Sequence, residues 1–130
     1  MTMSVLVLSL ILLGVLMSAA GQVLLKVAMS QQSMQAAIAH GGTTMLAALL
    51  TSPWLVLGVA VYGLSVLVWL AVLAKVDVSF AYPFVALGMV VTTLSGRFLL
   101  GEELPAMRLL GLSVIVIGVL VVASSYPRAG

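Results

Sequence analysis

The chain has few charged residues, and its long apolar stretches contain no acidic side chain. The only three carboxylates are Asp77, Glu102 and Glu103, and all of them lie where the apolar runs break. A membrane protein without a carboxylate near mid-membrane lacks the group that carboxylate-driven proton exchange requires. This pattern favours a protein that moves or holds an amphiphile.

Cysteine is absent as well, which excludes disulfides and thiolate metal sites. His40 is the single histidine, so the sequence predicts no metal site. The net charge of +2 and the lack of a basic run argue against nucleic-acid binding. There is no nucleophile–base pair and no phosphate-cradling glycine loop, so we expect neither an enzyme nor a cofactor.

Apolar residues are abundant: they make up 64% of the chain, and the mean hydropathy is +1.37. A soluble domain of this size needs more charge to cover its surface. A spanning helix needs about 20 mainly apolar residues, and lipid tolerates no unpaired backbone groups. The sequence therefore predicts an all-α membrane protein, residues 1–130 forming one domain with spans at 3–29, 54–74, 79–100 and 105–125.

Turn signals separate these spans. Ser52 and Pro53 are typical of an N-cap and a first helical position, and Trp54 is typical of an interfacial anchor. Residues 75–78 and 101–105 predict tight turns. In the one long connection, between the first two spans, the apolar residues 45–50 are too few to span, so we expect a short helix on the membrane surface there.

Orientation is weakly encoded. With the N-terminus on side A of the membrane, Lys75 and Arg128 lie on side A, while Lys26, Arg97 and Arg108 lie on side B. The difference in positive charge between the two sides is too small for the positive-inside rule to predict an orientation. Either a partner fixes the orientation, or copies insert both ways and form an antiparallel dimer that resembles two inverted repeats.

The first span carries a polar stripe. Ser18, Gln22 and Lys26 are four residues apart and share one helix face that runs toward side B. Polar groups inside a membrane are candidates for function. The alternative is structural: Ser18 and Gln22 bond neighbouring helices while Lys26 extends to the interface.

Aromatic residues lie inside the second span and at the start of the third. Tyr62 and Trp69 share a face of the second span, and Tyr82 opens the third. These rings are candidates to line a cavity for a sugar or an acyl chain. Ordinary aromatic packing is the alternative.

Three basic residues gather on side B, where they are candidates to neutralise a phosphate. Arginine offers bidentate contacts to such an anion, which makes Arg97 a candidate beside Lys26. In the alternative, Glu102 and Glu103 pair with Arg97 and Arg108, and Lys26 is left as the uncommitted cation.

The fourth span has two glycines seven residues apart. Gly111 and Gly118 lie on one face, and small residues permit close helix pairing in lipid. We therefore expect this span to form the dimer contact.

The chain resembles the drug/metabolite transporter superfamily, and its size matches the small multidrug resistance-like, EamA-type members with four helices. The segments that carry this resemblance are 81–95, 100–104 and 111–122. Residues 20–22, Lys26, 64–73 and 79–83 resemble the small flippase subunits for undecaprenyl-phosphate-linked aminoarabinose.

One departure from the family pattern matters. Proton-coupled small multidrug exporters have a glutamate three residues before the glycine that matches Gly21, and here that position is Ser18. Serine does not exchange a proton near neutral pH, so a carboxylate-based antiport is not expected. The pair Gly111 and Gly118 matches the dimerisation spacing of those exporters.

The resemblance implies a flippase in the bacterial inner membrane that moves a polyprenyl-phosphate-linked sugar in lipopolysaccharide modification. It implies a homodimer, or a heterodimer with a similar small subunit. Ser18, Gln22 and Lys26, with Arg97, would bind the head group, and the three aromatic rings would contact the sugar or the first isoprene units. Two alternatives remain open: an exporter of a small metabolite or drug, and a non-transporting subunit of a larger complex.

Overall fold

The computed structural model describes residues 5–125, and these residues form helices joined by short turns. The prediction of an all-α chain is confirmed. The elements, in chain order, are α1 (Val5–Ser30), α2 (Gln32–His40), α3 (Gly42–Thr51), α4 (Pro53–Leu73), α5 (Val78–Ala81), the 3₁₀ turn η1 (Tyr82–Phe84), α6 (Val85–Leu100) and α7 (Ala106–Ser124).

Four stretches are long and apolar enough to cross a membrane. They are α1, α4, the α5–η1–α6 stretch and α7, and the ends that fall within the described residues agree with the predicted spans to within one residue. At about 1.5 Å per residue, the 26 residues of α1 extend about 39 Å, which exceeds the roughly 30 Å of a hydrocarbon core. The chain is a multi-pass membrane protein.

The start of α4 follows the predicted capping pattern. Ser52 is the N-cap, and its hydroxyl oxygen accepts a hydrogen bond from the backbone N–H of Leu55 at 3.3 Å. Pro53 occupies the first turn, where its missing N–H costs no helical hydrogen bond.

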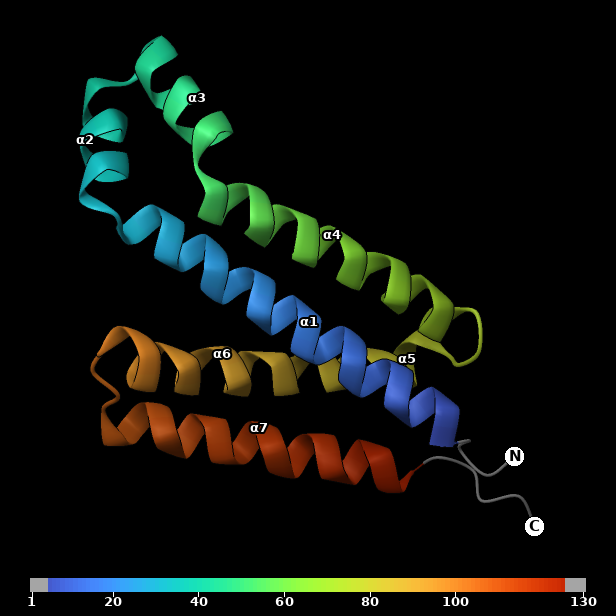
Figure 1. Ribbon diagram of the computed structural model, residues 1–130. Coiled ribbons are helices and arrows are strands. Elements are labelled where there is room, and N and C mark those ends of the chain that lie inside the picture. Colours follow the sequence, from blue (N-terminus) through green and yellow to red (C-terminus); the bar gives the residue numbers. More distant parts are fainter. Residues whose placement is uncertain (1–4, 126–130) are drawn as a thin grey trace.

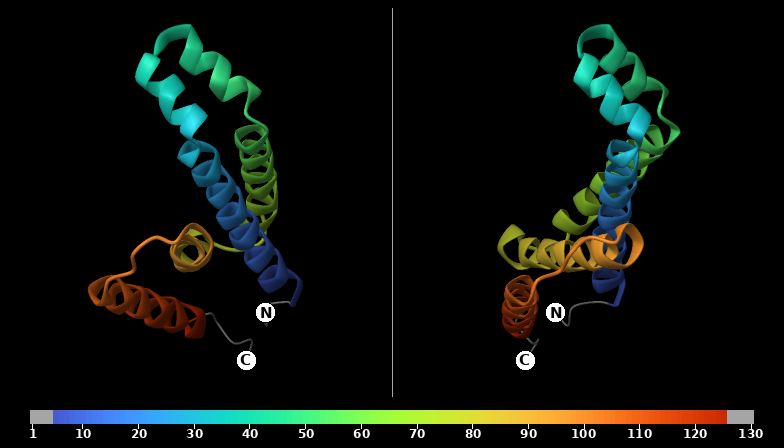
Figure 2. Two further views of the ribbon diagram at one scale, coloured as in Figure 1. Left: turned by 60° about the vertical axis from the view of Figure 1, so that its left-hand side comes forward. Right: turned by 90° about the vertical axis from the view of Figure 1, so that its left-hand side faces the viewer.

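The connection between α1 and α4 differs from the prediction. It contains two helices, α2 and α3, where the sequence predicted one helix at 45–50. A tight turn separates the two helices. Gly41 and Gly42 both have positive φ, at 67° and 56°, so the chain changes direction within two residues. The α2–α3 hairpin projects beyond the side-B ends of α1 and α4 (Figures 1 and 2). Its place on the membrane surface stays a prediction.

The third span is not one regular helix. Pro83 has no N–H to donate and its ring restricts the preceding residue, and the chain winds as a 3₁₀ turn at Tyr82–Phe84. The rings of Phe80 and Phe84 pack against each other across this turn, with centroids 5.3 Å apart and planes tilted by 54°. The turn therefore separates a short α5 from the longer α6.

Helix α1 is the central element of the bundle. It packs against α4 along its length and against α6 on another side, while α7 packs mainly against α6 and η1 (Figure 1). The α1–α4 pair is inclined to the α6–α7 pair (Figure 2). As a result, α1 and α6 cross near α5 and diverge toward side B.

The apolar core lies in the side-A half, where all four spans meet. The buried residues of this cluster come from every span: Val7, Ile11, Val15, Val72, Phe80, Ala81, Phe84 and Val119. Helices that are held together at one end and diverge at the other leave space between them, and this space contains the site described below.

Helices α1 and α4 approach each other closely at Gly21. A Cβ atom at this position would lie 3.0 Å from the backbone nitrogen of Tyr62 and 3.1 Å from the carbonyl oxygen of Gly58. Backbone atoms cannot rotate out of the way as a flexible side chain can. Gly21 therefore sets the distance between the two helices, in the manner of small-residue contacts in other membrane bundles.

We expect Gly21→Ala to lower the free energy of unfolding by about 1–3 kcal/mol, because the added methyl forces α4 away from α1. The measurement is thermal unfolding in mild detergent. Gly63→Ala, in the same α4, is the matched control: nothing lies within 4 Å of its Cβ position, so its melting temperature should stay at or above that of the wild type. Equal melting of Gly21→Ala and the wild type would contradict this account of the helix contact.

Candidate functional site: a cavity beside the central helix

A cavity of about 260 Å³ lies between α1, α4 and the third span. Its lining combines a few polar groups with aromatic and aliphatic side chains, as is usual for small-molecule sites. The residues around it are Gly14, Val15, Ser18, Gln22, Tyr62, Ser65, Val66, Trp69, Tyr82, Val85, Gly88 and Met89. Five of the residues predicted for the site are therefore brought together here: Ser18, Gln22, Tyr62, Trp69 and Tyr82.

The polar side of the cavity comes from α1. The amide of Gln22 donates to the hydroxyl of Ser18 over 3.5 Å, at the outer limit for a hydrogen bond. Both groups lie one helical turn apart on one face, as the stripe predicted. Such a long bond leaves most of the capacity of the amide and the hydroxyl available to a ligand.

The aromatic side comes from α4 and η1. The rings of Trp69 and Tyr82 meet edge to face, with centroids 6.3 Å apart and planes at 71°. Tyr62 is 42% exposed and Tyr82 is 60% exposed, so both rings border the open side of the cavity. The aromatic residues thus pack together and line a cavity at the same time, which combines the two interpretations that the sequence left open.

Several lining residues are not among those predicted for the site. Ser65 lies on the same face as Tyr62 and Trp69, but its hydroxyl donates to the carbonyl of Tyr62 at 2.6 Å and is buried. Met89 lies two turns from Tyr82, so helical periodicity was the available signal for it. Gly14 and Gly88 leave room simply by lacking side chains, which no motif marks.

The charges lie outside the cavity, and their pairing corrects one prediction. The amine of Lys26 lies 3.5 Å from a carboxylate oxygen of Glu102, so Lys26 is not the uncommitted cation of side B. Arg108 donates to the backbone carbonyl of Glu103 at 3.1 Å. The predicted Glu–Arg pairing was thus wrong for Glu102, because the turn after α6 directs this side chain toward α1.

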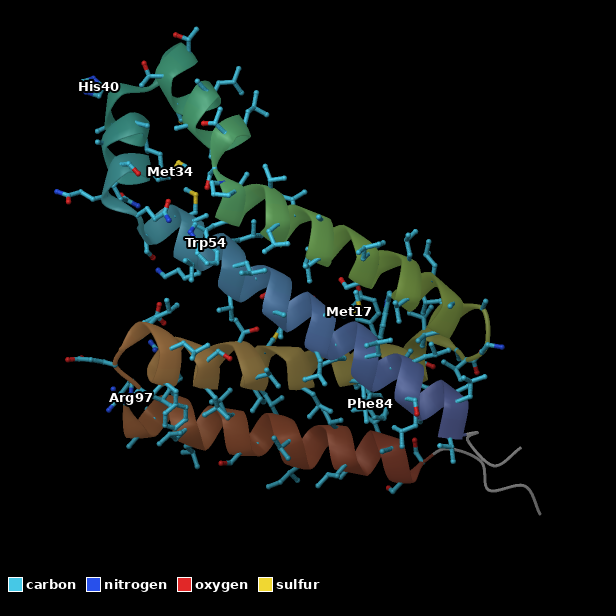
Figure 3. The ribbon with its side chains drawn as sticks, in the orientation of Figure 1. Met17, Met34, His40, Trp54, Phe84 and Arg97 are labelled. Atoms are coloured by element: carbon cyan, nitrogen blue, oxygen red, sulfur yellow. The ribbon has the colours of Figure 1, made fainter. Side chains whose placement is uncertain are left out.

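Arg97 does not line the cavity. It is exposed at the side-B end of α6, where it borders a separate shallow hollow with Glu103 and Pro105. Figure 3 shows its side chain beside the turn that joins α6 to α7. Of the predicted basic pair, only Lys26 lies on the helix face that continues from the cavity.

Within residues 5–125, the predicted dimer contact has no close neighbour. Gly111 and Gly118 are exposed on α7, and nothing lies within 4 Å of either Cβ position. The buried face of α7, with Leu112 and Val119, lies about 100° around the helix from the glycines. The glycine face is therefore available to a second chain.

The residues that line the cavity are all uncharged, and the ion pair of Lys26 with Glu102 lies on its side-B side, since Lys26 follows the lining residue Gln22 by one helical turn. Such a cavity suits the uncharged part of a ligand, and any ionic groups of that ligand would lie at the side-B edge. Residues 36–115 of the chain match the family described as Small Multidrug Resistance protein. The chain belongs to this family.

Curated relatives of this Small Multidrug Resistance chain carry one recurring name. A probable 4-amino-4-deoxy-L-arabinose-phosphoundecaprenol flippase subunit of Pseudomonas aeruginosa (strain UCBPP-PA14) is 38% identical over 117 residues, which are 90% of this chain and 96% of that protein. Its counterpart from Pseudomonas savastanoi pv. phaseolicola is 44% identical over 72 residues, which are 55% of this chain and 63% of that protein. No solved structure matches the chain.

Proposed function

We propose that this chain is a subunit of a flippase that moves a polyprenyl-phosphate-linked sugar across the bacterial inner membrane. The observation that carries the proposal is the cavity beside α1, which brings Ser18 and Gln22 opposite three aromatic rings. The family and the names of the relatives support the same reaction. Transport of this kind breaks no covalent bond, so the chain needs no catalytic group.

The size of the cavity suits a head group. At about 260 Å³ it is slightly smaller than the roughly 300–1,000 Å³ of pockets that enclose drug-sized ligands. A sugar fits such a space, whereas a polyprenyl tail does not. The tail would stay in lipid outside the cavity, and the exposed rims at Tyr82 and Met89, at 60% and 58%, leave the cavity open on one side.

The polar and aromatic sides would take different parts of the substrate. Ser18 and Gln22 would bond sugar hydroxyl groups, and Tyr62, Trp69 and Tyr82 would contact the ring or the first isoprene units. Lys26 would receive the phosphate, since it lies one turn beyond Gln22 on the same face. Arg97, at the end of α6, would attract the phosphate at the membrane surface without reaching the cavity.

The energy source follows from the missing carboxylate. No residue of the cavity lining is acidic, and position 18 is serine. Flipping would therefore run down the concentration gradient of the lipid, which a glycosyltransferase on the far side would maintain. Export of a cationic drug is less well supported, because no anion faces the cavity interior.

We expect Lys26→Ala to lose its bound lipid, because a phosphate without its cation is poorly held near lipid. Native mass spectrometry of protein purified in mild detergent measures this. Wild-type protein should carry a polyprenyl-phosphate-linked sugar, and Lys26→Ala should carry it at an occupancy at least about tenfold lower. Lys75→Ala, with an exposed lysine on side A, is the control and should keep the lipid. Wild-type protein that is free of such lipid and binds organic cations would overturn the proposal.

We also propose that α7 pairs with α7 of a second subunit, which is either a copy of this chain or a similar small protein. Gly111→Leu combined with Gly118→Leu should abolish pairing, because two large side chains would separate the helices. Disulfide crosslinking of single cysteines placed beside these glycines measures it in native membranes. Ser113→Leu, on an exposed part of α7 roughly opposite the glycine face, is the control and should keep pairing. Crosslinks only to an unrelated larger protein would favour a non-transporting subunit instead.

A further inference from the structure

The Glu102 side chain is held in place by the backbone around it. Gly101 has a φ of 68°, which turns the chain sharply at the end of α6. The N–H of Glu102 then donates to the carbonyl of Gly96 at 3.1 Å. The carboxylate folds back over Gly96, where one oxygen lies 2.7 Å from the position that a Cβ atom would take. Two glycines thus direct one carboxylate toward α1.

The ion pair that results stands at the side-B end of the cavity. Lys26 follows Gln22 by one helical turn, and Gln22 lines the cavity. Glu102 reaches Lys26 from the turn after α6, across the place where α1 and α6 diverge (Figures 1 and 2). The side chains are 57% and 46% exposed, so a ligand can reach both. An exposed pair of this kind is weak and is exchanged at little cost.

The charge balance of the exchange decides what ligand fits. A phosphate that takes Lys26 alone would leave Glu102 without its cation. A head group with both a phosphate and an amine would replace the internal pair by two new pairs, phosphate with Lys26 and amine with Glu102. Hydrogen bonds between such ionised groups are the strong ones. The other carboxylates do not share this position, since Asp77 lies in the side-A turn and Glu103 borders the hollow beside Arg97.

We propose that Glu102 is an amine-binding subsite that selects amino-sugar phosphates over neutral-sugar phosphates. This proposal rests on the proposed function and adds a residue to it. Lys26 supplies affinity for every polyprenyl phosphate, whereas Glu102 supplies the distinction between a charged amine and a neutral group at the same place on the sugar.

The test compares two lipids that differ only in the amine. Protein in nanodiscs is offered an equal mixture of 4-amino-4-deoxyarabinosyl phosphoundecaprenol and its N-acetyl derivative, and native mass spectrometry measures the bound ratio. We expect wild-type protein to prefer the free amine about tenfold or more. Glu102→Gln should bring the ratio to within about twofold of equality, with total lipid retained. Glu103→Gln, the neighbouring carboxylate, is the control and should keep the preference.

A second variant keeps both charges and moves only the carboxylate. The methyl of Gly96→Ala would occupy the place of the Glu102 carboxylate, which is the flexible end of a side chain and can shift aside. We expect an intermediate preference for the amine. This variant also tests the amine subsite if Glu102→Gln fails to fold.

The outcomes separate this inference from the proposed function. Equal binding of the two lipids by wild-type protein, or an unchanged preference in both variants, overturns the amine subsite and leaves the flippase proposal standing. Wild-type protein that binds neither lipid overturns both.

Discussion

The close contact of α1 with α4 is the constraint on which the rest of the structure depends. At Gly21 the two backbones touch, so α4 occupies one side of α1 and the third span must pack on another. The face between them, with Ser18 and Gln22, borders the cavity. In lipid, this is the arrangement that lets an uncharged polar side chain stay available to a ligand without a large desolvation cost.

The placement of charge follows from the same geometry. Helices that converge on side A form the apolar core there, and their divergence on side B gives Lys26 and Glu102 room to meet near the interface. A neutral cavity with an ion pair at its edge separates two tasks. In the proposed function, the cavity would take the sugar and its hydroxyl groups, and the edge would take the ionic groups, which would not have to enter the most apolar part of the bundle.

Much of this was predictable from the sequence. The spans follow from apolar runs of about 20 residues, and the polar stripe at Ser18 and Gln22 follows from helical periodicity. The α2 helix was missed because Gln32–His40 is short and much less apolar than the spans, and long apolar runs were the signal for helices. The Lys26–Glu102 pair was missed for a different reason: it depends on how α1 and α6 diverge and on the turn at Gly101, and a sequence does not contain the distance between two helices.

The most direct test of this account is a transport assay with the assembly purified from its native membrane and reconstituted in vesicles. The account predicts that a polyprenyl-phosphate-linked amino sugar crosses between leaflets without a pH gradient, and that imposing one changes the rate little, because no carboxylate faces the cavity interior. Accumulation of an organic cation driven by a pH gradient alone would contradict it.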